Sequence, residues 1–427
     1  MTIQTVMNRI NSPEALRSFT LLYGKEPEVI SMQKERYGRA LEAFSKAFPD
    51  RQEVQLFSAP GRTEIGGNHT DHQHGCALGA AVNCDAIAVV SFHHDGVIRL
   101  LSEGYGICEI NLSEPEPRED EKGKTAALIR GIAARFLNVG VKLGGFDAYV
   151  TSNVLSGSGL SSSAAFETLV AAIVNERYHD SRTDAIGIAK IGQYAENVYF
   201  GKNSGLLDQT ICSVGGMVFI DFGDVQRPSV SGFSFDFEAA GYALCMTDTK
   251  GSHSDLTDDY AAIVEEMHSV ARRFGKTYLR EVDEKEFYTA IPRLHGKVGD
   301  RALLRAIHYF GENRRAIGER ETLQNGDLAR FFSLFRQSAA SSEGLLQNLY
   351  SVHQPCAQGI PLALAVSRLI LGEDAAVRVH GGGFAGTIQA FVPTEQLAAY
   401  RDGMDAVFGA GSCQRLRIRP VGGMRVM

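Results

Sequence analysis

Residues 66–75, GGNHTDHQHG, concentrate side chains that could bind a metal or a polar substrate. His69, His72 and His74 could ligate zinc through their imidazole nitrogens, although their spacing matches no helix-based or knuckle-type zinc motif. A polar turn without a ligand is the simplest alternative. The adjacent APGR adds Arg62, whose planar guanidinium can pair with a carboxylate or with a phosphoryl group in transfer. The stretch is therefore a candidate for metal or substrate binding.

A second stretch, SGSGLSSSAAFETLV at residues 156–170, places glycines and hydroxyls directly before a predicted helix. The free amides and the positive dipole end at the start of a helix bind anions. Ser161, Ser162 and Ser163 add donors, and one of these hydroxyls could reach a Mg²⁺ held between phosphates. A serine-capped helix without a ligand would need only one serine. The pattern thus favours phosphate binding.

Phosphoryl transfer also requires a carboxylate for Mg²⁺ and a group that orients the acceptor hydroxyl. The stretch YAENVYFGKNSGLLDQT supplies Glu196 near the end of a predicted helix and Asp208 in the loop beyond it. Each acid alone would more commonly be a solvated surface group. In combination with the serine-rich loop, the two acids are candidates for metal binding and catalysis.

Other motifs have the letters of nucleotide sites but not their context. DFG at residues 221–223 lacks a preceding kinase catalytic loop, and GKT at residues 123–125 and 275–277 lacks the first glycine of a P-loop. GGGFAG at residues 381–386 is followed by the strand-like TIQAFVP, whereas a dinucleotide fingerprint opens a helix. We expect a loop between two strands, either a plain hairpin or a close approach of the backbone to a ligand.

The elements that must position these residues have an α+β pattern. The first fifty residues show helical spacing and capping signals. From Val54 to about residue 230, short β-branched and aromatic strands alternate with helical stretches. Beyond that point helices dominate, until a strand–loop–strand and a last strand, CQRLRIRPV, close the chain. A length of 427 residues favours two domains, or three small ones, over one core.

Composition narrows the partners and the compartment. Hydrophobic residues make up 44% and charged residues 22%, and the net charge is -7, so neither nucleic acid nor a membrane is an expected partner. The N-terminus lacks the features of a signal peptide and no apolar run would span a bilayer, so the expected compartment is the cytoplasm. Seven scattered cysteines without a C-x-x-C pair are expected to be reduced and mostly buried.

The order of these motifs resembles that of the galactokinases of the GHMP kinase superfamily. APGRTEIGGNHTDHQHG is similar to the galactokinase signature, A-P-G-R-x-N-x-I-G-E-H-x-D-Y, SGSGLSSSAA to the phosphate loop of the superfamily, and GGGFAG to its third motif. YAENVYFGKNSGLLDQ is similar to the family segment A-E-x(7–8)-G-x-x-D-Q, and FTLLYGKEPEVI to its N-terminal lead-in. The resemblance implies a two-domain α+β GHMP kinase fold with the active site in the cleft between the domains. Residues 1–230 would form the N-terminal domain, with the helical extension and the sugar and phosphate loops, and residues 231–427 the C-terminal domain with the third motif.

The resemblance also implies a sugar-1-kinase that uses ATP and Mg²⁺ to convert D-galactose to galactose 1-phosphate, as a monomer or weak homo-oligomer whose partners are the sugar and ATP. It makes Asp208 the catalytic carboxylate and Arg62 the group that stabilises charge during transfer. Ser163 and Glu196 would hold Mg²⁺. The residues expected to bind the nucleotide are Gly157, Ser158, Gly159, Leu160, Ser161, Ser162 and Ser163, with Ser102 as a weaker contact. The residues expected to bind the sugar are Asn68, His69, Asp71 and Tyr260.

The chain departs from the family pattern around the sugar-binding stretch. Glu64 stands where the family has Asn, Asn68 where it has the Glu that grips the sugar, and His72 where it has Tyr. An ionised carboxylate only accepts hydrogen bonds whereas an amide also donates them, so the change at Asn68 bears on the choice of sugar. The alternatives are a kinase for another sugar, such as an N-acetylhexosamine, arabinose or a uronic acid, or a regulator that binds sugar and ATP without turnover. One known route to such regulators is loss of a Ser-Ala pair in the phosphate loop, and here Ser163 and Ala164 are both present, which favours an enzyme.

Overall fold

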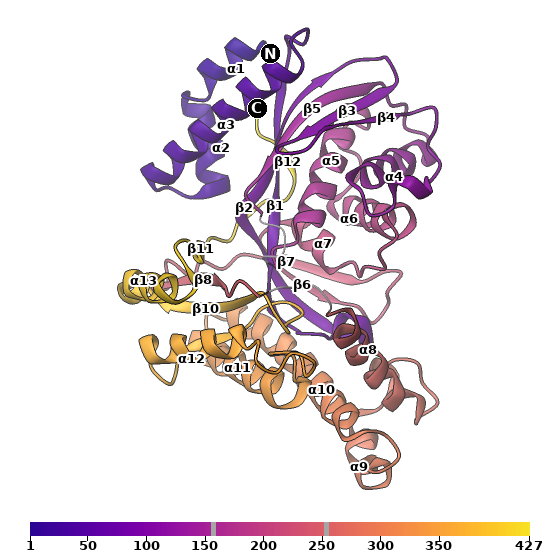
Figure 1. Cartoon of the computed structure of the whole chain (residues 1–427), viewed down its shortest axis with the longest axis vertical. Coiled ribbons are helices and arrows are strands. Elements are labelled where there is room, and N and C mark those ends of the chain that lie inside the picture. The colour runs from indigo at the N-terminus through magenta and orange to yellow at the C-terminus, as the bar shows by residue number, and fades with distance from the viewer. Residues whose placement is uncertain (155–158, 252–255) are drawn as a thin grey trace.

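A computed structural model describes residues 1–154, 159–251 and 256–427, which form two β-sheets with helices packed around them (Figure 1). The helices are α1 (Ile3–Arg9), α2 (Pro13–Tyr23), α3 (Pro27–Ala47), α4 (Thr125–Asn138), α5 (Ser162–Tyr178), α6 (Ala185–Tyr194), α7 (Leu207–Val214), α8 (Thr257–Arg272), α9 (Glu284–Leu294), α10 (Asp300–Gln324), α11 (Leu328–Ser341), α12 (Gly359–Leu371) and α13 (Leu397–Phe408). The strands are β1 (Gln55–Gly66), β2 (Cys76–Phe92), β3 (Val97–Ser102), β4 (Ile107–Asn111), β5 (Gly145–Ser152), β6 (Met217–Asp221), β7 (Ser229–Phe233), β8 (Tyr242–Asp248), β9 (Ala376–Val379), β10 (Thr387–Pro393), β11 (Cys413–Leu416) and β12 (Met424–Arg425). The predicted α+β class is confirmed.

The first sheet has eight strands and is built around the long antiparallel pair β1 and β2. Its order is β12-β1-β2-β5-β3-β4, and β6 and β7 extend it from β2. Successive side chains of a strand face opposite sides of a sheet, so neighbouring residues of β1 lie in different cores. Leu56 packs against α1, α2 and α3, whereas Phe57 packs against α4 and α5. The N-terminal extension and the layer of α4 to α7 therefore cover opposite faces of the sheet (Figure 1).

The second sheet, β11-β8-β10-β9, is antiparallel throughout and holds GGGFAG in the loop between β9 and β10. Val377 and Ile388 pack on one face with residues of α12 and α13, and Phe391 packs on the other with Phe335 of α11. The predicted strand–loop–strand is confirmed.

The two sheets share a core at the far end of the β1–β2 pair. Ile65 and Leu78, near the tip of this hairpin, pack in one cluster with Met246 of β8 and Phe335 of α11. The loop that joins β1 to β2 contains most of the stretch GGNHTDHQHG. This candidate loop therefore lies at the junction of the two sheets, next to α10 and the glycine-rich loop.

Parts of the C-terminal segment 231–427 belong to the first sheet. β7, which begins at Ser229, pairs with β6 beyond residue 230. At the end of the chain, β12 pairs with β1, and the carbonyl of Met427 accepts from the amide of Leu56 at 2.8 Å. The chain thus crosses to the second sheet after β7 and returns after β11.

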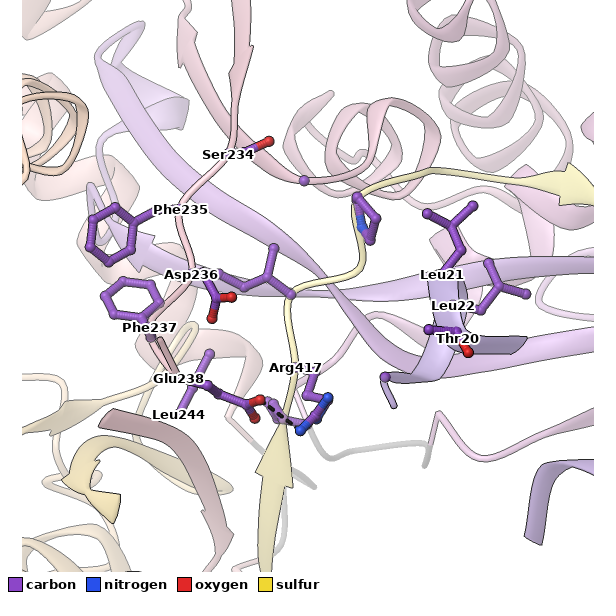
Figure 2. Close-up of a pocket in the computed structure, with 15 residues that line it drawn as sticks. Thr20, Leu21, Leu22, Ser234, Phe235, Asp236, Phe237, Glu238, Leu244 and Arg417 are labelled. Atoms are coloured by element: carbon purple, nitrogen blue, oxygen red, sulfur yellow. Dashed lines mark ion pairs between the residues drawn. The ribbon is translucent and has the colours of Figure 1, made fainter. Parts of the chain in front are cut away.

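A cavity of about 640 Å³ lies where the N-terminal extension meets the connections between the sheets (Figure 2). Leu21 and Leu22 of α2 are among the residues that line it, as are Phe235 and Phe237 of the segment before β8. An ion pair of 2.6 Å between Glu238 and Arg417 borders it. The candidate catalytic, sugar-binding and nucleotide-binding residues are not in its lining, as far as the structure describes them, so their site lies elsewhere.

Two composition-based expectations can be compared with the structure. Within the described ranges no helix is long and apolar enough to cross a membrane. The seven cysteines are free thiols, and all but Cys356 are fully or partly buried, as predicted.

Candidate active site

Arg62 and Asp208 form the ion pair at the centre of the candidate site. Arg62 lies on β1, and its Nε and Nη2 donate to the two carboxylate oxygens of Asp208 at 2.6 and 2.9 Å. The sequence placed Asp208 in a loop, but it lies in the first turn of α7, where the helix dipole favours a negative charge. Ser161 also donates to this carboxylate, and Arg62 donates to the carbonyl of Gly159. The pair thus connects β1, α7 and the serine-rich loop.

The environment of Asp208 keeps its carboxylate ionised. Burial alone would raise its pKa, but the charge of Arg62 and the hydrogen bonds from Arg62 and Ser161 outweigh burial and hold the pKa below its ordinary value. The side chain is 34% exposed, so a ligand can reach the carboxylate.

The described part of the phosphate loop, residues 159–163, is anchored to β1. The amide of Arg62 donates to the carbonyl of Leu160 at 3.0 Å, and a Cβ at Gly61 would lie 2.8 Å from the same oxygen. This close approach explains the glycine of APGR. Ser162 and Ser163 begin α5, whose first amides have no partners within the helix. Gly157 and Ser158 were also predicted to bind the nucleotide, but they lie outside the described residues.

The two predicted metal ligands, Ser163 and Glu196, lie next to each other. Their Oγ and Oε1 atoms are 3.3 Å apart, and Glu196 is buried in the π-helical segment Ala195–Phe200. Lys202 Nζ lies 2.8 Å from the same Oε1. Hydroxyl and carboxylate oxygens are suitable ligands for Mg²⁺, which commonly takes only one or two protein ligands beside phosphates.

A second buried carboxylate, Glu167, was missed by the sequence analysis. Gln209 Nε2 donates to Glu196 at 2.9 Å and to Glu167 at 3.1 Å, and so bridges the two acids. Burial and the neighbouring Glu196 raise the pKa of Glu167 to about 8. The available signal was an acid one helical turn after Ser163, in a stretch of otherwise small and apolar residues.

An open cavity of about 690 Å³ adjoins the phosphate loop. Its lining includes Ser102 at the end of β3 together with Ser162 and Ser163, so residues distant in sequence meet there. Aromatic side chains also line it, among them Tyr105 and Phe166. A volume of several hundred Å³ with apolar walls and a few polar groups is typical of a small-molecule site.

The predicted sugar-binding side chains contact the glycine-rich loop. Asn68 Nδ2 lies 2.7 Å from the carbonyl of Gly381, and His69 Nε2 lies 2.9 Å from that of Gly382. Tyr260 donates to the carbonyl of Gly383 at 3.0 Å. Three consecutive carbonyls of the third motif therefore face the three side chains.

Asn68 is almost wholly engaged inside the protein. Besides Gly381, its Nδ2 donates to Glu64 Oε1 at 3.0 Å, and its Oδ1 accepts from Asn348 at 3.0 Å and from Ser342 at 3.4 Å. The residue is 1% exposed. A direct contact of Asn68 with a sugar stays a prediction, and it requires the amide to exchange one of these partners.

Burial and their mutual charge interaction shift the pKa values of His69 and Asp71. Burial lowers the pKa of His69 and raises that of Asp71, while their mutual interaction opposes both shifts. The charge of Asp208 also contributes to the raised pKa of Asp71. The candidate sugar and catalytic residues therefore share one electrostatic environment.

The three histidines of the loop do not converge on a metal. His74 stacks on Tyr278 with ring centroids 3.6 Å apart, and His69 and His72 meet edge to face at 5.5 Å. In the part of the chain that the structure describes, no group of three or more His, Cys, Asp or Glu side chains could hold a metal ion. The described residues give the zinc interpretation no support.

Comparisons with known proteins match the segments that carry these residues. A model of the GHMP kinases N terminal domain matches residues 127–216, and a model of the galactokinase galactose-binding signature matches residues 42–92. A galactokinase from Streptomyces coelicolor is 29% identical over 373 residues, which cover 85% of this chain and 91% of that protein.

Solved structures share the fold. The crystal structure of Lactococcus lactis galactokinase complexed with galactose aligns with a TM-score of 0.76 at 22% identity, and covers 90% of this chain and 98% of that one. The mevalonate kinase of Methanococcus jannaschii aligns with a TM-score of 0.57 at 14% identity, over 86% and 98% of the two chains.

These findings define the class: the chain has the fold of the GHMP kinases, and residues 127–216 match the GHMP kinases N terminal domain. One matched segment contains Ser163, Glu196 and Asp208. The other contains Arg62 and the loop of residues 67–75, called the sugar loop below. The chain is a galactokinase-like sugar kinase.

Proposed function

We propose that this sugar kinase transfers the γ-phosphoryl group of ATP to the C1 hydroxyl of D-galactose. The observation that carries the proposal is the Arg62–Asp208 pair beside Ser161, because it brings an ionised carboxylate and a fixed cation to the phosphate loop. The galactose-binding signature and the galactose complex of the Lactococcus lactis relative support galactose as the sugar.

In this proposal, Asp208 orients the C1 hydroxyl and accepts its proton. The hydroxyl oxygen attacks the γ-phosphorus, the bond from the γ-phosphorus to the bridging oxygen breaks, and ADP leaves with the electron pair. Arg62 lies against the carboxylate and offers positive charge where negative charge develops on the transferring group. The products are galactose 1-phosphate and ADP.

Mg²⁺ and the nucleotide are assigned to the neighbouring residues. Ser163 Oγ and Glu196 Oε1 would hold Mg²⁺, which would neutralise charge on the phosphates of ATP. Residues 157–163 would bind those phosphates, and the cavity that contains Ser102 would take the rest of the nucleotide. Lys202 would have to leave its 2.8 Å contact with Glu196 when a metal ion binds.

Four residues are assigned to the sugar. We assign His69, Asp71 and Tyr260 as direct contacts and Asn68 as the residue at which the preference for a sugar is set, in line with its departure from the family pattern. We expect the protein to act in the cytoplasm as a monomer or weak homo-oligomer, which size-exclusion chromatography with light scattering would check.

The experiment measures ADP release with a panel of free sugars for the unchanged chain, Asp208→Asn and a control, Asp180→Asn. Galactose should give the highest kcat/KM, and Asp208→Asn should lower kcat by about 10²- to 10⁴-fold because the neutral amide cannot accept the proton. Asp180 is an exposed surface acid, and its amide variant should match the unchanged chain.

Each other outcome rejects one part of the proposal. Turnover unchanged in Asp208→Asn would remove the catalytic assignment. A clear preference for an N-acetylhexosamine, arabinose or a uronic acid would remove galactose. Sugar binding without any ADP release would identify a regulator in place of an enzyme.

A further inference from the structure

Glu312 of α10 lies directly beneath the sugar loop. Its Oε1 accepts from the backbone amides of Gly67 and Asn68 at 3.1 and 3.2 Å, and from Ser338 Oγ at 2.7 Å. The side chain is wholly buried. A carboxylate that accepts two adjacent backbone amides fixes the peptide that carries them, and such charge-assisted bonds are stronger than neutral ones.

The carboxylate of Glu312 is ionised although it is buried. Burial alone would raise its pKa, but the charges of Arg315 and Arg378 and the hydrogen bond from Ser338 act against burial, and the pKa is lowered to about 2. Arg315 Nε donates to the other oxygen, Oε2, at 2.8 Å, and Arg378 Nη1 lies 3.8 Å from Oε1. The two arginines therefore compensate the negative charge of the Glu312 carboxylate.

His308, one turn earlier on α10, binds the backbone carbonyl of Asn68. Its Nε2 lies 2.9 Å from the carbonyl oxygen of Asn68, so this nitrogen is the donor, and its Nδ1 lies 2.9 Å from Ser341 Oγ. Burial lowers the pKa of His308 to about 4, so the ring is neutral. Residues four apart share one face of a helix, and here that face binds both the amide and the carbonyl of Asn68.

The position of Asn68 determines where the next side chains stand. His69 comes directly after it with a left-handed φ of 58°, and Asp71 comes two residues later. Gly67 and Asn68 begin the loop, so an anchor on their amides sets the direction in which the chain continues to His69 and Asp71.

We propose that Glu312 is a positioning residue for sugar binding, which acts by holding the backbone of Gly67 and Asn68 so that His69 and Asp71 face the sugar. The inference rests on the proposed function, because it takes these side chains as sugar contacts. It assigns Glu312 no contact with the sugar or with ATP.

A matched control lies two turns along the same helix. Glu319 is also wholly buried, and neither of its carboxylate oxygens has a hydrogen-bond partner among the described residues. Burial and the nearby Glu312 raise its pKa well above the ordinary value, which favours the neutral acid. Glu319→Gln therefore keeps nearly the same shape and introduces no charge.

The experiment compares Glu312→Gln, Glu312→Asp and Glu319→Gln with the unchanged chain. Sugar KM, ATP KM and kcat are measured, together with amide hydrogen exchange of the peptide that contains residues 66–75. Both Glu312 variants should raise sugar KM by about tenfold or more and speed exchange in that peptide. Glu312→Gln replaces the charged acceptor of the two amides with a neutral one, and Glu312→Asp moves the carboxylate away from them. ATP KM, kcat and all values for Glu319→Gln should stay within about twofold.

Each contrary result overturns the inference. The inference fails if Glu312→Asp leaves sugar KM and hydrogen exchange unchanged. It also fails if sugar binding, ATP binding and kcat are impaired equally, because that result indicates a general packing defect. If Glu312→Gln does not fold, Glu312→Asp, which keeps the charge, decides. If the unchanged chain phosphorylates no sugar, the proposed function fails, and hydrogen exchange alone then decides whether Glu312 holds the loop.

Discussion

Arg62 gives Asp208 two properties that are hard to combine in one side chain. A carboxylate close to a transferring phosphoryl group must be shielded from water, and shielding alone raises its pKa. The two hydrogen bonds from Arg62 reverse this effect and also fix the orientation of the carboxylate. We infer that Arg62 serves the acid as well as the phosphoryl group.

Removing the charge of Arg62 should therefore change the pH dependence of the reaction. In Arg62→Met, the pKa of Asp208 should rise because burial is opposed less strongly, so the loss of kcat/KM at acid pH should begin at a higher pH. The maximal kcat should also fall by about 10²- to 10³-fold, since charge that develops during transfer is less stabilised. The measurement is a pH profile of kcat/KM.

Arg62→Lys is the matched control for this prediction. It keeps the positive charge but not the two-pronged geometry, so its acid limb should stay near that of the unchanged chain while its kcat is reduced. An acid limb that stays in place in Arg62→Met would show that Arg62 does not set the ionisation of Asp208.

Candidate site residues could be selected from the sequence where a local motif indicates their chemistry. Arg62, Ser163 and Glu196 stand in motifs whose residue types already indicate phosphate and metal binding. Glu167 and Glu312 were not predictable in the same way, because their roles depend on neighbours from other helices and loops. A buried acid on a helix looks like any other acid until the tertiary structure places a partner beside it.

At the scale of elements, the sugar loop and the glycine-rich loop hold each other. Each of the carbonyls of residues 381–383 faces a side chain assigned to the sugar. The glycines there are required by backbone geometry at more than one point. Gly383 has a φ of +79°, and a Cβ on it would lie 2.1 Å from the carbonyl oxygen of Asn348. Gly381 has a φ of +67°, but a Cβ there would meet nothing within 4 Å.

Alanine at these two glycines should therefore have different effects. Gly383→Ala adds a clash with backbone to the left-handed strain, and should lower the free energy of unfolding by about 2–4 kcal/mol and raise sugar KM. Gly381→Ala adds only the strain and should cost about 1 kcal/mol. Urea unfolding and sugar KM measure both effects, and equal stability losses in the two variants would contradict this account of the loop.

The elements themselves were largely predictable, with one consequential exception. Capping signals and apolar spacing indicated α2, α3 and α5, and the glycine-rich motif was correctly expected between strands. The helix α7 was taken for a loop because the stretch before it, GKNSG, is rich in turn residues and α7 has only eight residues. The first turn of that helix carries Asp208, so the error concerned the surroundings of the catalytic candidate rather than its identity.

At the scale of the whole molecule, Asp85 of β2 joins segments from both ends of the chain. It accepts from Tyr23 at 2.6 Å, pairs with Arg36 at 2.6 Å and with Arg419 at 3.2 Å, and is wholly buried. The first two partners belong to the N-terminal extension and the third to the returning C-terminal segment. The group thus fastens the extension and the last residues to the first sheet.

Breaking this group should destabilise the protein more than breaking a surface pair. Arg419→Met leaves Asp85 with one fewer buried cation and should lower the free energy of unfolding by about 3 kcal/mol. Arg425, which pairs with Glu176 at 3.0 Å, is 49% exposed, and Arg425→Met should cost less than about 1 kcal/mol. Urea unfolding of both variants checks the prediction, and equal costs would show that the buried group does not fasten the C-terminal segment.

The sequence was sufficient to predict the α+β class, but not how the ends of the chain are used. Periodicity reports which residues face a core, whereas the pairing of β12 with β1 and the placement of the extension on one face depend on contacts across hundreds of residues. For the same reason, local patterns could not show which parts of the segment 231–427 belong to the first sheet and which to the second.

The most direct test of the central claim is the identity of the product. The unchanged chain is incubated with ATP, Mg²⁺ and D-galactose, and phosphorus NMR determines which oxygen of the sugar carries the phosphate. We predict galactose 1-phosphate, with phosphorus coupled to the proton on C1, and almost none of it from Asp208→Asn. Phosphate on another hydroxyl, or hydrolysis of ATP without any phosphorylated sugar, would contradict the account.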